Sequence, residues 1–512
     1  MTGDVEGLSQ VLRVRREKLA AIREKGLEPF AYAFDAEATT AGALADFETA
    51  ETAGSLDDAG HGKPLSVAGR IVSWRDMGKS VFAHLEDASG RLQLYLRKDA
   101  LGEDAFANLA LLDLGDWIGV EGPTFRTKTG EVSLRAASWT LLTKSLRPLP
   151  LGKVETDAET GERIVHSGFA DQEARYRQRY ADLAVHPEVR EVFRTRARVI
   201  TALRTFLDGE GFLEVETPAL QPLYGGAAAE PFVTTHNALD QTMYLRIADE
   251  LYLKRLIVGG LERVYEICKD FRNEGLSRFH NPEFTMLEWY QAFTDYEAQM
   301  DLVERMMLHV LDTVHGRRTL THAGTEIVFE APFRRIGLVA SLSEALGTDV
   351  HAMSDAQLRA RAEEAGVPDL KGAGRGKLID KLFGAHVEPT LVQPTFVIDH
   401  PKELSPLAKQ HRADPRLTER FELYISGVEI CNGFSELNDP IDQRQRFEAQ
   451  GTLRAAGDDE AHQVDEDYIR ALEYGMPPTG GVGMGVDRFL MVIANQASIR
   501  DVILFPMLRT ED

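Results

Sequence analysis

The sequence predicts an α+β protein in which a small N-terminal β-barrel precedes a larger domain of mixed helices and strands. Short strand patterns separated by turn residues follow one another from about residue 65 to residue 141. A long helical pattern begins near His186, and residues 264–293 then form a strand, a tight loop and a second strand. At 512 residues the chain is too long for one ordinary domain, so two or three are expected.

The composition is typical of a soluble globular protein, with 43% hydrophobic and 27% charged residues. No apolar run approaches the ~20 residues that span a bilayer, and the N-terminus lacks a basic and then apolar leader pattern. Cys268 and Cys431 have no spacing typical of a zinc site or a disulfide framework. We therefore expect a cytoplasmic protein without membrane association.

The formal net charge of −23 argues against indiscriminate binding of nucleic acids, because such binding depends on neutralising phosphates. A particular RNA could still bind to a local basic surface. One candidate surface is the predicted helix of residues 8–25, which carries Arg13, Arg15, Arg16, Lys18, Arg23 and Lys25. The alternative is that this segment is only the solvated face of a helix.

The predicted barrel follows this helix and an Ala-, Glu-, Asp- and Gly-rich stretch that ends near Lys63. Its strand patterns are residues 66–74, 81–86, 91–96, 117–121 and 132–141. A turn at residues 87–90 and a helical patch near residues 99–111 connect them. Five short strands within about 80 residues are typical of a small oligonucleotide-binding barrel.

The alternation within two of these strands separates an apolar face from a polar and aromatic face. The apolar face carries Val81, Ala83, Leu85, Leu92, Leu94 and Leu96, and the other face carries Phe82, His84, Gln93 and Tyr95. Aromatic and polar groups together are the chemistry that stacks and reads unpaired bases. The alternative is that Phe82 belongs to the core.

A linker at residues 146–180 separates the barrel from a helix whose Pro187 occupies a favoured first-turn position. The apolar stripe of that helix is Val189, Val192, Val199, Leu203 and Phe206, and the helix ends near Gly209 and Gly211. Without further information it could be an ordinary core helix. Residues 340–390 form an Ala-rich helical insertion.

The strand–loop–strand segment carries the clearest chemistry. Arg272, Glu274 and His280 are close together in the loop, and an arginine and a histidine beside an aromatic face suit a nucleoside phosphate. The following strand places Phe284, Met286, Glu288 and Tyr290 on one face and Leu287 and Trp289 on the other. Glu288 lies about four residues, or roughly 13 Å, from Phe284. Its buried carboxylate would suit a cationic group at that distance.

Three segments together resemble the motifs of class II aminoacyl-tRNA synthetases. Residues 211–218 are similar to motif 1, residues 271–290 to motif 2 and residues 481–488 to motif 3. The amino-acid sequence of motif 2 resembles that of bacterial lysyl-tRNA synthetases, which belong to subclass IIb. This resemblance covers nearly the whole chain and is weakest in the first 60 residues and around residues 340–390.

The resemblance implies a domain order. It runs from an N-terminal helical extension (1–60) through an OB-fold anticodon-binding domain (61–145) and a linker (146–180) to a catalytic domain (181–512). The catalytic domain is expected to be an antiparallel β-sheet flanked by helices. Its motif 1 covers about residues 190–220, motif 2 about 264–293, the helical insertion about 340–390 and motif 3 about 480–509.

The resemblance also implies the reaction, which is ATP-dependent activation of L-lysine to lysyl-adenylate and transfer of lysine to the 3′-terminal adenosine of tRNA(Lys). Expected partners are ATP, L-lysine, tRNA(Lys), Mg²⁺ and a second copy of the chain, which would form a homodimer through motif 1. The lysine carboxylate is already ionised at neutral pH, so its attack on the α-phosphorus needs no general base. Positioning and charge stabilisation are sufficient.

Family roles carry over to named residues. The catalytic residues are Arg272 and Arg488, and the ATP-binding residues are Arg272, Glu274, His280, Phe284, Glu429 and Arg488. The magnesium carboxylates are Glu429 and Glu436. The lysine-binding residues are Gly226, Glu250, Glu288, Tyr290, Asn432, Phe434 and Glu436. The anticodon-binding residues are Phe82, Gln93 and, more weakly, Arg70. A strict pleat puts Glu429 and Glu436 on opposite faces, unless a bulge at Gly433 intervenes.

The sequence departs from the family pattern at four positions, none of which is assigned to catalysis, and the departures leave open the phosphate contacts near Phe279 and the loop around Glu230. The departures are Glu230 in Ala–Glu–Pro–Phe, Asp249 for a usual proline, Phe279 for a basic residue before His280, and Cys431 for a usual glycine. The rival assignments are an aspartyl or asparaginyl synthetase, whose pocket would need a cation, and a non-catalytic RNA-binding relative. A paralogue that lysylates elongation factor P would lack the barrel. A lipid-lysylating fusion would need membrane helices.

Overall fold

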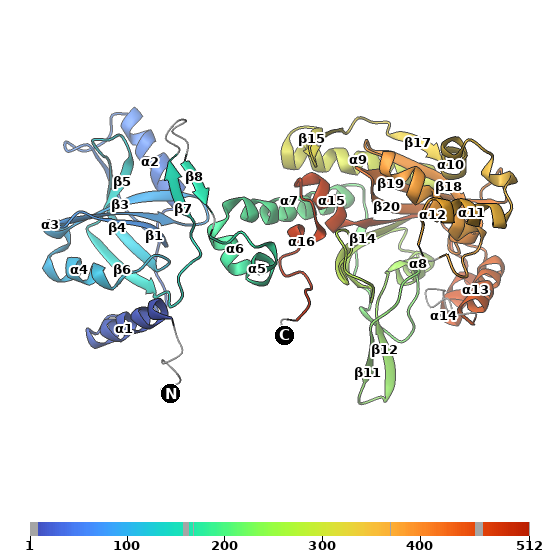
Figure 1. Ribbon diagram of the computed structural model, residues 1–512, viewed down its shortest axis with the longest axis horizontal. Helices are drawn as coiled ribbons and strands as arrows, with labels where there is room; N and C mark the ends of the chain where they lie inside the picture. The colour runs from blue at the N-terminus through green and yellow to red at the C-terminus, as the bar shows by residue number, and fades with distance from the viewer. Residues whose placement is uncertain (1–8, 157–162, 167, 369, 456–463, 511–512) are drawn as a thin grey trace. The chain divides into compact units, whose positions relative to one another are not determined.

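The computed structural model describes residues 9–156, 163–166, 168–368, 370–455 and 464–510 (Figure 1). The chain divides into two compact units, residues 1–170 and 171–512. The first unit is a β-barrel with helices, and the second is a large sheet with helices on both faces. The predicted α+β class is therefore confirmed.

The barrel of the first unit has six strands rather than the five predicted. They are β1 (His61–Asp76), β2 (Ser80–Glu86), β3 (Arg91–Arg97), β4 (Trp117–Arg126), β5 (Val132–Arg135) and β6 (Ser138–Thr143). The order is β1-β2-β3-β5-β4-β6, and pairing of β1 with β4 closes the barrel. The predicted single strand 132–141 is two strands, because β5 pairs with both β3 and β4 whereas β6 pairs with β4 alone. Gly122 of β4 lies against the Arg135 carbonyl at the end of β5. A residue with a Cβ would collide with this carbonyl, so glycine allows the chain to pass this closely between β5 and β6.

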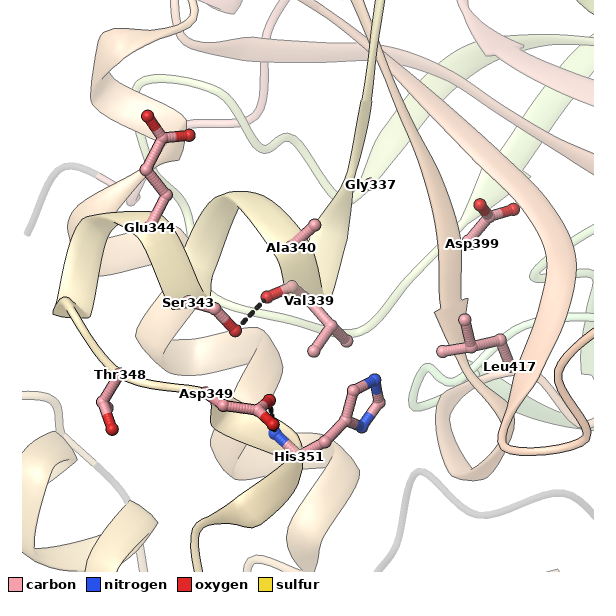
Figure 2. A pocket seen from close by; sticks show the side chains of 10 residues that line it. All are labelled: Gly337, Val339, Ala340, Ser343, Glu344, Thr348, Asp349, His351, Asp399 and Leu417. Atoms are coloured by element: carbon pink, nitrogen blue, oxygen red, sulfur yellow. Dashed lines mark hydrogen bonds between the residues drawn. The ribbon is translucent and has the colours of Figure 1, made fainter.

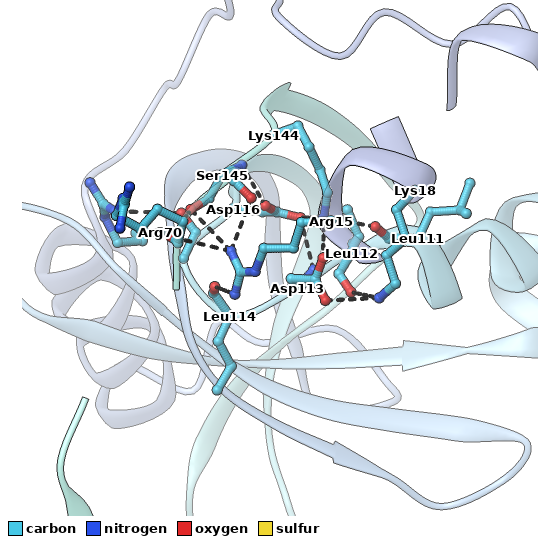
Figure 3. A network of polar contacts seen from close by, with 12 residues as sticks. Arg15, Lys18, Arg70, Leu111, Leu112, Asp113, Leu114, Asp116, Lys144 and Ser145 are labelled. Carbon is cyan, nitrogen blue, oxygen red and sulfur yellow. Dashed lines mark hydrogen bonds and ion pairs between the residues drawn. The ribbon is translucent and has the colours of Figure 1, made fainter. Parts of the chain in front are cut away.

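Helices α1 (Gln10–Glu24) and α2 (Thr40–Thr52) precede the barrel, and α3 (Lys98–Leu101), α4 (Glu103–Asn108) and η1 (Leu109–Leu111) form the predicted helical patch. The basic side chains of α1 are used in part to attach it to the barrel (Figure 3). Arg15 donates to the Leu114 carbonyl at 2.8 Å, and Lys18 pairs with Asp113 at 2.8 Å. Arg13, Arg16 and Arg23 remain exposed.

The segment predicted as a linker contains regular structure. Strands β7 (Lys153–Thr156) and β8 (Arg163–His166) form a hairpin, and helices α5 (Gln172–Arg177) and α6 (Arg179–Val185) follow. The boundary between the two units falls between these two pairs of elements.

The second unit is built on an eight-stranded sheet in the order β17-β18-β19-β20-β21-β14-β13-β9. Neighbouring strands are antiparallel except for the parallel pairs β17–β18 and β13–β9. In chain order the strands are β9 (Leu213–Glu214), β13 (Arg263–Phe271), β14 (Glu283–Ala292), β17 (Arg334–Gly337), β18 (Thr395–Pro401), β19 (Leu417–Ile425), β20 (Val428–Ser435) and β21 (Thr479–Gly485).

Helices cover both faces of this sheet. One face packs α7 (Pro187–Gly209), α9 (Tyr296–His315) and α15 (Val486–Ile493) into the main core, which includes Leu287 and Trp289. Helices α8 (Glu250–Val258) and α14 (Glu466–Glu473) pack with Tyr290 on the opposite face. The predicted stripe of α7 is confirmed, since Val189, Val199 and Leu203 are buried and the helix begins at Pro187.

Smaller elements complete this unit. The predicted insertion is helical and has its own core, formed by α10 (Leu338–Leu346), α11 (Asp355–Glu364) and α12 (Arg375–His386). A separate three-stranded sheet consists of β10 (Leu220–Gln221), β11 (Val233–His236) and β12 (Gln241–Leu245). The remaining elements are β15 (Thr319–His322), β16 (Thr325–Val328), η2 (Val350–Ala352), η3 (Glu388–Thr390), η4 (Lys402–Leu404), α13 (Pro440–Ala455) and α16 (Ile499–Val502). Within the described residues, no helix is long and apolar enough to cross a membrane.

Candidate active site

The register of three adjacent strands assembles most of the predicted pocket. Glu288 of β14 and Asn432 of β20 both lie opposite Gly483 of β21. In the next row, Tyr290 and Phe434 both lie opposite Gly481. Because β21 presents glycine at both central positions, side chains from the neighbouring elements can lie directly over its backbone. A Cβ at Gly481 would collide with Tyr290 and with Glu436 Oε1.

One end of this site is acidic and buried. Glu288 is 5% exposed; its Oε2 accepts a hydrogen bond from the Tyr290 hydroxyl at 3.2 Å, and its Oε1 one from the Asp249 backbone N–H at 3.5 Å. Burial raises the pKa of Glu288, and the neighbouring Asp249 raises it further. A carboxylate in this position gains from a cationic ligand, because the cation would offset the cost of burying the charge.

Glu436 and Glu250 belong to the same acidic end. Glu436 Oε2 forms an ion pair with Lys254, which also pairs with Glu250. The other oxygen of Glu436, Oε1, is buried without a hydrogen-bond partner among the described residues. Gly226 lies against Glu250, since a Cβ on this glycine would be 3.2 Å from the Glu250 Cβ. Lys254 was not among the predicted site residues, although its spacing of four residues from Glu250 on a helix is a signal for this pairing.

The opposite end carries the predicted phosphate-binding groups. The Arg272 guanidinium lies 5.1 Å from the centre of the Phe284 ring. Arg488 Nη1 donates to Glu429 at 2.9 Å, and Arg488 Nη2 lies 3.0 Å from His280 Nε2. Burial and the Arg488 charge lower the pKa of His280, which favours the neutral form of this imidazole. Glu274 is exposed in the loop after β13.

The predicted pairing of Glu429 with Glu436 as magnesium ligands is wrong in its geometry. Seven residues lead from Glu429 to Glu436, and one of them is the extra residue of a bulge. The remaining six strand steps correspond to roughly 20 Å at the usual rise, and Glu436 pairs with Lys254 instead. A bulge does occur, but at Ile430 rather than Gly433. Leu423 pairs with Cys431 and the next residue, Tyr424, pairs with Glu429. Ile430 and Cys431 are both buried in the main core.

This bulge directs Glu429 to the same face as Asn432 and brings it near Glu422 of β19. Arg420 donates to both Asn432 Oδ1, at 2.9 Å, and Glu422 Oε1, at 2.6 Å. Burial raises the pKa of the half-buried Glu388 to about 7, and Glu429 and Glu422 raise it further. Excess negative charge and an all-oxygen donor set fit a hard cation such as Mg²⁺. Glu422 and Glu429 are therefore the carboxylates that could hold it.

A second acidic cluster lies behind Glu288. Single ligand atoms of Asp249, Cys268 and Asp270 all lie within 4.8 Å of one another. Arg246 lies 3.1 Å from Asp249 Oδ1 and 3.5 Å from Asp270 Oδ1, so a guanidinium already offsets part of their charge. Burial and then Asp270 raise the pKa of Asp249 to about 8. Asp249, which stands where the family usually has a proline, therefore lies in a buried acidic cluster.

The barrel places Phe82 and Gln93 on its outer face and not in its core. Phe82 is half-buried and stacks on Tyr95, with ring centres 4.7 Å apart. The Gln93 amide contacts Glu131 and Ser133, both at 2.6 Å. Arg70 lies on the same face, and its guanidinium rests 4.8 Å from the Trp117 ring centre.

Arg75 is a closer cation to Phe82 than Arg70 is. It is directly opposite Phe82 in the β1–β2 ladder and is exposed. Arg75 was not among the predicted site residues, because only the pairing of β1 with β2 places it beside Phe82.

A separate groove of about 590 Å³ lies beside α10 and contains none of the predicted site residues (Figure 2). Ser343 donates to the Val339 carbonyl at 2.7 Å, and Asp349 accepts from the His351 backbone N–H at 2.9 Å. These polar groups therefore have local partners. The groove is not the candidate active site.

Comparison with known proteins identifies the family. Residues 171–509 match the family model of tRNA synthetases class II (D, K and N), and residues 65–142 match that of the OB-fold nucleic acid binding domain. A lysine–tRNA ligase of Carboxydothermus hydrogenoformans is 51% identical over 99% of both chains. Its counterpart from Pelotomaculum thermopropionicum is 50% identical over 100% of this chain and 97% of its own. That of Staphylococcus haemolyticus is 47% identical over 98% and 99%. The chain therefore belongs to the class II tRNA synthetases of the D, K and N group and carries an OB-fold domain before its synthetase domain.

Proposed function

We propose that this protein is a lysine–tRNA ligase. The observation that carries the proposal is the buried acidic end of the pocket, where Glu288 lies over Gly483 and the unpartnered Glu436 Oε1 lies over Gly481. An aspartate or asparagine side chain offers no cation to these groups, whereas the ε-ammonium of lysine does. The full-length similarity to lysine–tRNA ligases supports the same choice.

The two ends of the site fit the two halves of the activation step. The lysine carboxylate attacks the α-phosphorus of ATP, forming the mixed anhydride, while the bond to pyrophosphate breaks. Arg272 can hold the reacting carboxylate and α-phosphate through the planar fork of its guanidinium. Arg488 and His280 lie where the distal phosphates would extend. No general base is required, because lysine already presents a carboxylate.

Magnesium is proposed as the accompanying cation, with Glu422 and Glu429 holding it. Bound there, it would offset the negative charge of the phosphates. Glu429 also accepts a hydrogen bond from Arg488 at 2.9 Å, which positions that guanidinium beside the same phosphates.

The transfer step requires recognition of tRNA(Lys), which we assign to the outer face of the barrel. Phe82 supplies a stacking surface supported by Tyr95, and Gln93 supplies an amide two residues away on the adjacent strand. Arg70 and Arg75 add positive charge to this face. The chain as a whole is strongly acidic, so local basic groups of this kind are needed to approach a polyanion.

We further propose a homodimer formed through α7 and β9, in the cytoplasm. Strand β9 is an edge of the eight-stranded sheet, and its Leu213 is 51% exposed. An exposed edge strand with an apolar side chain is a surface that another chain can cover.

The decisive test is ATP–pyrophosphate exchange with each of the twenty amino acids. Lysine alone should support exchange above background. Exchange with aspartate or asparagine in place of lysine would overturn the proposal, and absence of exchange with every amino acid would favour a non-catalytic RNA-binding protein.

A further inference from the structure

Lys254 is a buried cation within the pocket that should receive a cationic substrate. It lies on α8, is fully buried, and its ammonium pairs with both Glu250 and Glu436. The same ammonium lies 5.4 Å from the centre of the Phe434 ring. Lys254 therefore contacts Glu250, Glu436 and Phe434, which are all proposed to bind lysine. No step of the reaction described above uses Lys254.

The carboxylates around Lys254 explain why a cation is present. Glu250 and Glu436 are both buried, and the ammonium of Lys254 lies against each of them. Without this ammonium the two buried carboxylates would face each other with no cationic partner in the empty pocket, which is costly.

The contact of Lys254 is also one-sided. It pairs with Oε2 of Glu436, while Oε1 is buried beside Tyr290 and Gly481 without a hydrogen-bond partner among the described residues. A carboxylate held through one oxygen presents the other in a defined direction.

We infer that Lys254 is a positioning residue for the substrate, which orients Glu250 and Glu436 towards the ammonium groups of lysine. This inference rests on the proposed function. Lys254 does not touch the reacting atoms, so it should affect the KM for lysine far more than kcat or the KM for ATP.

The groups around Lys254 define the expected pH dependence. Glu250, Glu436 and Tyr468 face its ammonium, and Tyr290 and Arg420 are the next charged or titratable neighbours. Burial raises the pKa of both glutamates, and Lys254 offsets part of this increase. In Lys254→Met the pKa of both carboxyls should therefore rise further, which favours their neutral form and weakens their attraction for an ammonium group.

The first test is lysine-dependent pyrophosphate exchange by Lys254→Met. Its KM for lysine should rise about 100-fold or more at pH 7, as expected for a buried ion pair that loses one partner. The increase in the KM for lysine should become smaller as the pH is raised, because higher pH favours the ionised forms of Glu250 and Glu436. The KM for ATP should change less than threefold. Equal increases in both KM values, without recovery at high pH, would show that Lys254 only supports the fold.

Lys254→Ala provides a second readout, because n-propylammonium has the size and charge of the part removed. Added propylammonium should lower the KM of this variant for lysine, whereas it should only inhibit the wild-type enzyme by competing for the pocket. Lys144→Ala is the matched control. Lys144 is also buried, pairs with Asp113 at 2.5 Å and Asp116 at 2.8 Å, and lies in the barrel (Figure 3). It should show neither the KM effect nor the rescue.

Lys254→Arg keeps the proposal testable if both truncated variants fail to fold. Arginine retains the charge, but its fork can bind both oxygens of Glu436 and so occupy Oε1. Its KM for lysine should rise at least tenfold with an unchanged melting temperature. A wild-type KM in this variant would refute the orienting role. Loss of lysine-dependent exchange in the wild-type protein would instead refute the proposed function.

Discussion

Replacing Glu288 by glutamine tests the acidic pocket most directly. The substitution keeps the shape of the side chain and removes only its charge. It also keeps an oxygen that can accept a hydrogen bond from the Tyr290 hydroxyl, which lies 3.2 Å from Glu288 Oε2 in the wild-type protein. Because Glu288 is 5% exposed, water cannot replace the lost partner of the substrate ammonium. Glu288→Gln should therefore weaken lysine binding and leave ATP binding nearly intact.

The magnitude follows from burial and from the pKa of the group. Breaking a buried charge pair typically costs ~3–5 kcal/mol. Burial and Asp249 raise the pKa of Glu288, so the empty pocket already holds part of this charge as a proton, which reduces the cost. We therefore expect about 3 kcal/mol, which corresponds to a KM for lysine increased about 100-fold.

The assay is pyrophosphate exchange at varied lysine and varied ATP. Glu283→Gln is the matched control, because Glu283 lies on the same strand, is 51% exposed at its side chain and pairs only loosely with Lys269 at 3.8 Å. The control should retain the wild-type KM for lysine. An unchanged lysine dependence in Glu288→Gln would show that the ε-ammonium binds elsewhere.

Three further outcomes are expected. Phe82→Ala should reduce tRNA charging through the loss of base stacking, worth ~1–3 kcal/mol per base, and should spare pyrophosphate exchange; equal losses in both assays would make Phe82 a structural residue. Among lysine analogues, ornithine should be activated weakly, since a missing methylene costs ~1–3 kcal/mol, and norleucine should be rejected ~10⁴-fold because the pocket carboxylates stay unpaired; better exchange with norleucine than with ornithine would contradict the acidic pocket. Asp249→Asn should raise the melting temperature, and by more at pH 8.5 than at pH 6. The folded-state pKa of Asp249 is about 8 against ~3.9 when unfolded, so the stability that its neutral form provides is lost as the pH rises between these values. A gap between the melting curves that does not widen with pH would refute this account.

Much of this protein is determined by local sequence. The two-residue period of β14 alone predicts that Leu287 and Trp289 enter the core while Glu288 and Tyr290 face the other way, and the structure confirms it. The start of α7 at Pro187 and its buried stripe follow from proline geometry and helical periodicity in the same manner. These features depend only on neighbours within one turn or one strand.

The tertiary structure alone decided which distant groups meet. The bulge at Ile430 has no sequence signal, yet it turns Glu429 towards Glu422 and away from the predicted pairing with Glu436. Strand register, set by packing over the whole sheet, places Glu288, Gly483 and Asn432 in one row. The contact of Lys254 with Glu436 joins residues 182 positions apart. Such contacts depend on how separate elements pack, which no local pattern records, so the chemistry of each residue could be predicted but not its partner.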